Sequence, residues 1–177
     1  MVGRAPLTGP NLLEVIATDY GAILYFSRKY DRAIEQFRTV LEMEPSFSRA
    51  HMLVFAYMGK GQLADAIADI ENWRHIEDSP WGWSGLTYIY GRSGQPAKAR
   101  QTLEKLERMY SRRQIDPAPM FVAHIGMNNK DKAFAWLQKA YLEHSSALTA
   151  LRVDPIYDSL RDDPRFQELM RGVGLAQ

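Results

Sequence analysis

Apolar residues recur along the chain at the spacing of an α-helix. Trp83, Leu86, Thr87 and Tyr90 fall on one helical face, because residues three, four and seven positions apart share a face. A glycine-containing turn at residues 92–95 follows, and a second segment with helical spacing then begins. The pattern predicts two consecutive helices that pack against each other across these faces.

Four alanines indicate that this pair is one of a series. Ala33, Ala66, Ala99 and Ala133 lie 33, 33 and 34 residues apart, each within a helix-like stretch. A small side chain lets two helices approach closely, and the large residues that follow it fill the spaces between them. A fixed period of about 34 residues is typical of a solenoid of helix pairs. We therefore predict an all-helical chain that acts through a shaped surface rather than a catalytic pocket.

The repeated units resemble the tetratricopeptide repeat, in which Trp, Leu, Gly and Tyr mark the first helix and Ala and Phe mark the second. The unit that starts at Trp83 is the clearest match, whereas the fourth unit has Met120, Phe121 and His124 in the places of Leu, Gly and Tyr. The resemblance implies an all-α, right-handed superhelical solenoid of four antiparallel helix pairs. The repeat region would span residues 11–145, with the pairs at about 14–46, 47–79, 80–113 and 114–146.

The last part of the chain, residues 147–177, is interpreted as a capping segment. Asp163 followed by Pro164 predicts a helix start, and Gly172 with Gly174 predicts its end. Solenoid ends expose core-like surface, so a lid is expected there. The apolar residues expected to seal the last pair are Ile156, Leu160, Phe166 and Leu169.

This tail, together with Lys130–Ala133, also resembles the end of the tetratricopeptide module of bacterial multidomain regulators. Those regulators include winged-helix transcription regulators, serine/threonine kinases and nucleotide cyclases. No kinase, cyclase or DNA-binding domain accompanies the repeats in these 177 residues, so those activities do not transfer. The resemblance implies a signalling context for the repeats.

Composition narrows the function classes further. A net charge of +1 argues against a nucleic-acid binder, and the basic run between Lys98 and Arg113 is interleaved with glutamates, as on a solvated helix face. Residues 1–10 form a lead-in without the apolar run of a signal peptide, and no apolar stretch is long enough to span a membrane. Together with the absence of cysteine, these features favour a soluble, cytoplasmic protein with no membrane or nucleic-acid partner.

Residue types that carry catalysis do not converge in this sequence. The four histidines lack paired metal-ligand spacing, and the glycine-containing stretches 59–61 and 91–94 fall where the repeat needs its turns. Asp162 and Asp163 lie at a predicted helix cap, with no base nearby in the sequence. We expect a protein that is not an enzyme and that uses no metal or cofactor.

The first helices of the pairs carry a second apolar face. Relative to Trp83, the residues Trp81, Ser84 and Tyr88 lie on the opposite side of the helix, and large apolar residues occupy equivalent places in other units. Neighbouring helices or the N-terminal segment could cover part of this face, since large apolar side chains are often core residues. The predicted partner-binding groove comprises Tyr25, Phe26, His51, Met52, Phe55, Trp81, Ser84, Tyr88 and Val122.

Three functions are compatible with such a groove. The first is a protein-interaction scaffold that receives an apolar peptide or helix of a regulatory partner. The second is a structural module that forms a homodimer through the same surface, and the third is a sensor of a small apolar ligand. Members of the family that clamp a carboxylate use Lys, Asn and Arg, which this groove lacks. The corresponding places hold Thr18, Ala22, His51, Phe55, Ser84 and Tyr88.

Overall fold

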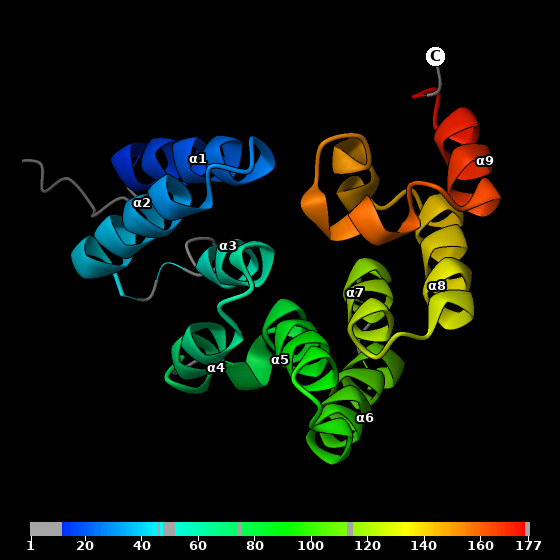
Figure 1. Cartoon of the computed structure of the whole chain (residues 1–177), viewed down its shortest axis with the longest axis horizontal. Helices are drawn as coiled ribbons and strands as arrows, with labels where there is room; N and C mark the ends of the chain where they lie inside the picture. The colour runs from blue at the N-terminus through cyan, green and yellow to red at the C-terminus, as the bar shows by residue number, and fades with distance from the viewer. Residues whose placement is uncertain (1–11, 46, 48–51, 74–75, 113–114, 176–177) are drawn as a thin grey trace, which may run out of the picture.

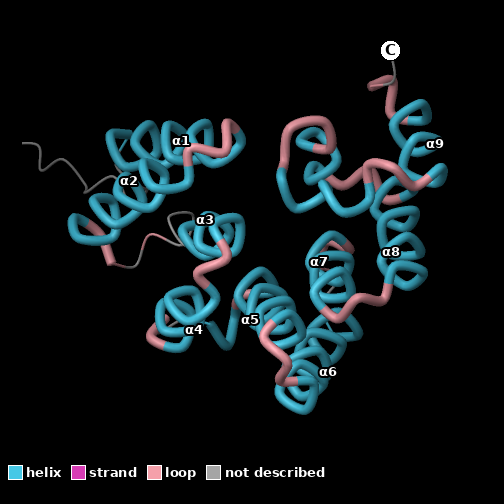
Figure 2. The backbone as a smooth tube through the Cα atoms, viewed as in Figure 1, coloured by secondary structure: helices cyan, strands magenta, loops and turns pink. Residues whose placement is uncertain are grey.

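A computed structural model describes residues 12–45, 47, 52–73, 76–112 and 115–175. Among these residues all regular secondary structure is helical, joined by loops and turns and with no strand (Figure 2), which confirms the all-helical prediction. The lead-in predicted for residues 1–10 and the predicted groove residue His51 lie outside the described residues.

The helices follow one another around an arc (Figure 1). The longer ones are α1 (Leu12–Phe26), α2 (Tyr30–Met43), α3 (Leu53–Lys60), α4 (Leu63–Glu71), α5 (Pro80–Arg92), α6 (Pro96–Arg112), α7 (Ala118–Gly126), α8 (Lys130–Leu142) and α9 (Pro164–Gly172). Short 3-10 helices are η2 (Ile76–Asp78), η3 (Ser146–Ala150) and η4 (Pro155–Leu160). From α1 to α8, each odd-numbered helix packs against the even-numbered helix that follows it.

The turn inside each of these four pairs has the same backbone conformation. One residue of each turn has a positive φ, between 57° and 78°, and these residues are Arg28, Gly61, Gly94 and Asn128. The amide that follows each one donates to the carbonyl five residues earlier, at 2.9 Å in all four turns. Glycine adopts a positive φ without steric cost, whereas Arg28 holds it against the preference of its side chain. These turns are 33, 33 and 34 residues apart, as the alanines are.

The four repeat alanines lie in the first turn of each second helix. All are buried, and the amide of each donates to the carbonyl four residues earlier at 3.0–3.1 Å. Their burial at the same place in every pair agrees with a small residue at each helix crossing.

Replacing Ala66 or Ala99 with leucine should destabilise the protein by ~1–3 kcal/mol, because the larger side chain must enter packed space. Urea unfolding followed by circular dichroism measures the free energy of unfolding. Ala97→Leu is the matched control on an exposed part of α6 and should leave it unchanged. If both buried-site variants unfold like the parent protein, these alanines do not lie at helix crossings.

The end of the chain covers the apolar face of the last helix pair. Leu160, Phe166 and Leu169 are buried in one cluster with residues of α7 and α8, which include Phe121 and Leu137. These three are among the four residues that the sequence predicts to cover the last pair. The fourth, Ile156, is only partly buried and contacts both this cluster and the core of the earlier helices.

His124 on α7 is buried at the place that Tyr57 and Tyr90 hold in the two preceding pairs. Burial, and then the charge of Lys132, lower its pKa to about 4. The unfolded histidine binds a proton below pH ~6.5, whereas the folded one does so only near pH 4, so stability falls as the pH drops through this window. The loss attributable to His124 should approach ~3 kcal/mol.

Urea unfolding between pH 7 and pH 4.5 tests this pH dependence. His124→Tyr introduces the residue type of the two preceding pairs and removes the titrating group, so its stability should decline less on acidification than that of the parent protein. An identical decline in both proteins would contradict the assignment to His124.

Candidate binding pocket

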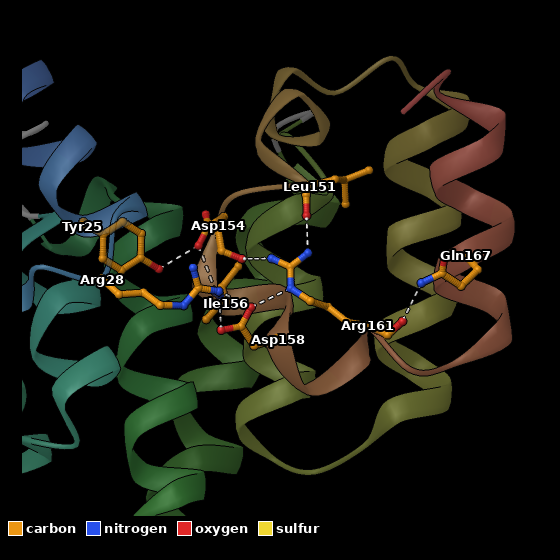
Figure 3. Close-up of polar contacts among 8 residues, drawn as sticks. All are labelled: Tyr25, Arg28, Leu151, Asp154, Ile156, Asp158, Arg161 and Gln167. Atoms are coloured by element: carbon orange, nitrogen blue, oxygen red, sulfur yellow. Dashed lines mark hydrogen bonds and ion pairs between the residues drawn. The ribbon is translucent and has the colours of Figure 1, made fainter. Parts of the chain in front are cut away.

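The C-terminal segment returns to the first helix pair. In Figure 1, η3 and η4 lie on the inner side of the arc and face the end of α1. The hydroxyl of Tyr25 donates to Oδ1 of Asp154 at 2.7 Å, and Nη2 of Arg28 lies 2.9 Å from both carboxylate oxygens of Asp158 (Figure 3). Because these partners are 129 and 130 positions apart, the segment bridges the two ends of the arc.

One arginine and one aspartate fix the shape of this segment. Arg161 donates through Nε to Oδ1 of Asp158 at 2.7 Å, through Nη1 to the carbonyl of Leu151 at 3.2 Å, and through Nη2 to the carbonyl of Asp154 at 3.1 Å. Asp154 also caps η4, since its Oδ1 accepts from the amide of Ile156 at 2.9 Å. The side chain of Asp154 is thereby held toward α1.

A cavity of ≈ 400 Å³ lies between the inner helices and this segment. Its volume falls within the ~300–1,000 Å³ typical of sites for small ligands. The wall contains several aromatic side chains, and Asp154 is the one charged residue among its described members. The lining residues are Tyr25, Met52, Val54, Phe55, Ile70, Trp73, Ser79, Trp81, Gly82, Val122, Ala147, Ala150, Asp154, Ile156 and Tyr157.

Five of the predicted groove residues lie on this wall, namely Tyr25, Met52, Phe55, Trp81 and Val122. Trp81 is 41% exposed, and its ring meets that of Phe55 edge to face with the centroids 6.0 Å apart. Tyr25 and Val122 are buried, so they shape the cavity from inside. The structure thus brings together predicted residues from α1, α5 and α7 and from the region of α3.

The other described residues of the predicted groove lie off the wall. Ser84 is fully buried, and its hydroxyl donates to the carbonyl of Pro119 at 2.7 Å, which joins α5 to α7 instead of facing a groove. Tyr88 packs between the two core clusters and against Gly126. Phe26 is partly buried in the core of the earlier helices, beside the ring of Tyr25. We therefore expect Tyr88→Ala to lower the melting temperature. A residue that only lined the groove, as the sequence predicts for Tyr88, would leave the melting temperature nearly unchanged.

Sequence reasoning missed the part of the wall formed by the C-terminal segment. Asp154, Ile156 and Tyr157 were interpreted only as part of the capping segment, because no periodic pattern relates them to α1. The repeats do contain a signal for another contact of this segment, the ion pair between Arg28 and Asp158. The positive-φ position of the turn holds Gly61, Gly94 and Asn128 in three pairs but Arg28 in the first.

The polar end of the pocket is a carboxylate beside a neutral hydroxyl. Burial raises the pKa of Asp154, and the hydrogen bond from Tyr25 acts in the opposite direction. Burial, and then the charge of Asp154, raise the pKa of Tyr25 well above its ordinary value, so the phenol stays protonated and donates. The guanidinium groups of Arg28 and Arg161 both contact the carboxylate of Asp158 instead.

No family model matches this chain, and no curated protein matches it. Among the described residues, no group of histidine and acidic side chains is arranged to hold a metal ion. None of the helices in the described part of the chain is both long and apolar enough to span a membrane.

Proposed function

We propose that this protein is a non-enzymatic interaction module of tetratricopeptide type. The four equivalent turns, the four buried alanines and the helix pairs that follow one another around an arc support this architecture. In such a solenoid the first helices line the inner surface, and binding takes place there. The module binds a segment of a protein partner, in a signalling context like that of the regulators it resembles.

The observation that carries this proposal is the aromatic pocket. Large apolar side chains that remain partly exposed, such as Trp81, are common at interface hot spots. Since the C-terminal segment occupies part of the inner surface, the remaining space suits a few side chains of an extended peptide. A whole helix, ~10 Å across, fits it less well.

Selection of peptides from a random heptapeptide library on the immobilised protein tests this function. We expect the selected peptides to share apolar residues and to bind at least tenfold more weakly to Trp81→Ala, because a hot-spot truncation costs at least ~2 kcal/mol. The melting temperature of this variant should stay close to that of the parent protein, since Trp81 is partly exposed.

Leu142→Ala serves as the matched control, because Leu142 is an exposed apolar residue on α8 that does not line the pocket. This variant should bind the selected peptides as the parent protein does. Peptides that bind Trp81→Ala as tightly as the parent protein would place the binding site elsewhere.

Self-association is the second candidate function, and a different surface favours it. One side of α1 exposes a row of large apolar side chains at helical spacing. Its members are Leu12, Leu13, Ile16, Tyr20 and Ile23. A second copy packed on this row would double the 20.3 kDa mass in light scattering, and Ile16→Asp should return the mass to that of one chain.

A further inference from the structure

We infer that the pocket receives an ammonium group on an apolar stem, supplied by a lysine side chain of the partner segment. The inference rests on the proposed function and specifies the chemistry of the residue that enters. It follows from three properties of the pocket: its aromatic wall, the carboxylate of Asp154 and its open rim.

The wall suits a cation with an apolar body. Five aromatic side chains of the described residues line it, from α1, from the regions of α3, α4 and α5, and from η4. In that order they are Tyr25, Phe55, Trp73, Trp81 and Tyr157. Aromatic faces attract ammonium groups through their quadrupoles, and more strongly where water is excluded. The methylene stem of a lysine would contact the apolar atoms of the same wall.

Charge complementarity selects a cation over a neutral group. Among the residues that the structure describes, Asp154 is the only charged one on the wall, and its carboxylate is largely buried against Tyr25. Nearby positive charge comes from Arg161, which binds the main-chain carbonyl of Asp154 and the carboxylate of Asp158. A bound ammonium group would place a positive charge beside a carboxylate whose burial disfavours the ionised form.

The hydrogen bonds of Asp154 favour lysine over arginine. Oδ1 already accepts from the hydroxyl of Tyr25 and from the amide of Ile156. Within the described part of the chain, Oδ2 accepts no hydrogen bond. A guanidinium pairs best with both oxygens of a carboxylate at once, whereas an ammonium group can bind a single oxygen.

The partly exposed rim favours a peptide over a free amine. Trp81 lies on the wall and is also 41% exposed, so a ligand that continues out of the pocket would contact its ring. A small amine enclosed in the pocket would leave this surface uncovered.

Titration with matched tripeptides tests the inference. One probe is an acetylated, amidated tripeptide of phenylalanine, lysine and leucine, and the second has norleucine in place of lysine. Tryptophan fluorescence and calorimetry at pH 7 measure the affinities. We expect the lysine peptide to bind at least tenfold more tightly than the norleucine peptide, and Asp154→Asn to abolish this preference. n-Butylammonium alone should bind much more weakly than the lysine peptide.

Asp162→Asn is the matched control, because Asp162 lies on the same C-terminal segment but is exposed and does not line the pocket. It should keep the preference for lysine, and circular dichroism should show both variants folded. Tighter or equal binding of the norleucine peptide would overturn the inference while leaving an apolar pocket as proposed. Retained preference in Asp154→Asn, or butylammonium binding equal to that of the lysine peptide, would also overturn it. The proposed function is tested separately: it would be contradicted if peptides selected from the library bound Trp81→Ala as tightly as the parent protein.

Discussion

Removal of residues 153–177 is expected to abolish cooperative unfolding and to cause aggregation. The truncation takes away Leu160, Phe166 and Leu169, which are buried against α7 and α8. The apolar face of the last helix pair would then be exposed to water, and the contacts of Asp154 with α1 and of η4 with α3 would be lost with it.

Calorimetry measures the cooperativity of unfolding, and light scattering measures aggregation. Point variants distinguish the loss of the cap's apolar packing from the effect of shortening the chain. Phe166→Ala should cost ~3–5 kcal/mol, because it leaves a cavity in a packed cluster. Glu168→Ala, on the exposed side of the same helix, should change little. A truncated chain that remains soluble and unfolds as cooperatively as the parent protein would show that this segment is not a lid.

Gly126→Ala is expected to destabilise the protein by ~3 kcal/mol or more, at the upper end of overpacking effects. A Cβ at this position would lie 2.1 Å from Cα of Tyr88 and 2.7 Å from its carbonyl oxygen. Because the obstacle is backbone, α5 and α7 would have to move apart. Ser84 would then lose its 2.7 Å hydrogen bond to the carbonyl of Pro119.

Gly172→Ala is the control for this effect, since the atoms nearest to a Cβ there belong to the side chain of Tyr141, at 3.4 Å or more. This variant should be as stable as the parent protein or slightly more stable, because alanine favours the helix. Chemical unfolding of the two variants under the same conditions gives the comparison. Equal stability of Gly126→Ala and the parent protein would mean that the close approach of α5 and α7 does not exist.

The helical pairs could be predicted because their determinants are local. The spacing of Ala33, Ala66, Ala99 and Ala133 reports one small residue for each helix crossing, and all four are buried. Each crossing lies a few residues after a turn of one conformation, so sequence neighbours define it. The close approach at Gly126 was not predicted, because it depends on the register between α5 and α7.

Only part of the pocket wall could be predicted from the sequence. Helical periodicity shows which face of a helix a residue occupies, and it identified Met52, Phe55 and Trp81 in this way. Periodicity does not show which faces a neighbouring helix covers, and for that reason Ser84 was assigned to the groove. The contact between Tyr25 and Asp154 joins segments 129 residues apart and depends on the curvature of the whole arc.

Methyl NMR tests most directly whether the pocket is the binding site. Isoleucine and methionine methyl groups report from the wall at Met52, Ile70 and Ile156, and from exposed surface at Ile16, Ile23 and Met43. Titration with a peptide selected from the random library should shift the signals of the wall and leave those of the exposed residues in place. Shifts confined to Ile16 and Ile23, with the wall signals unchanged, would contradict a binding site in the pocket.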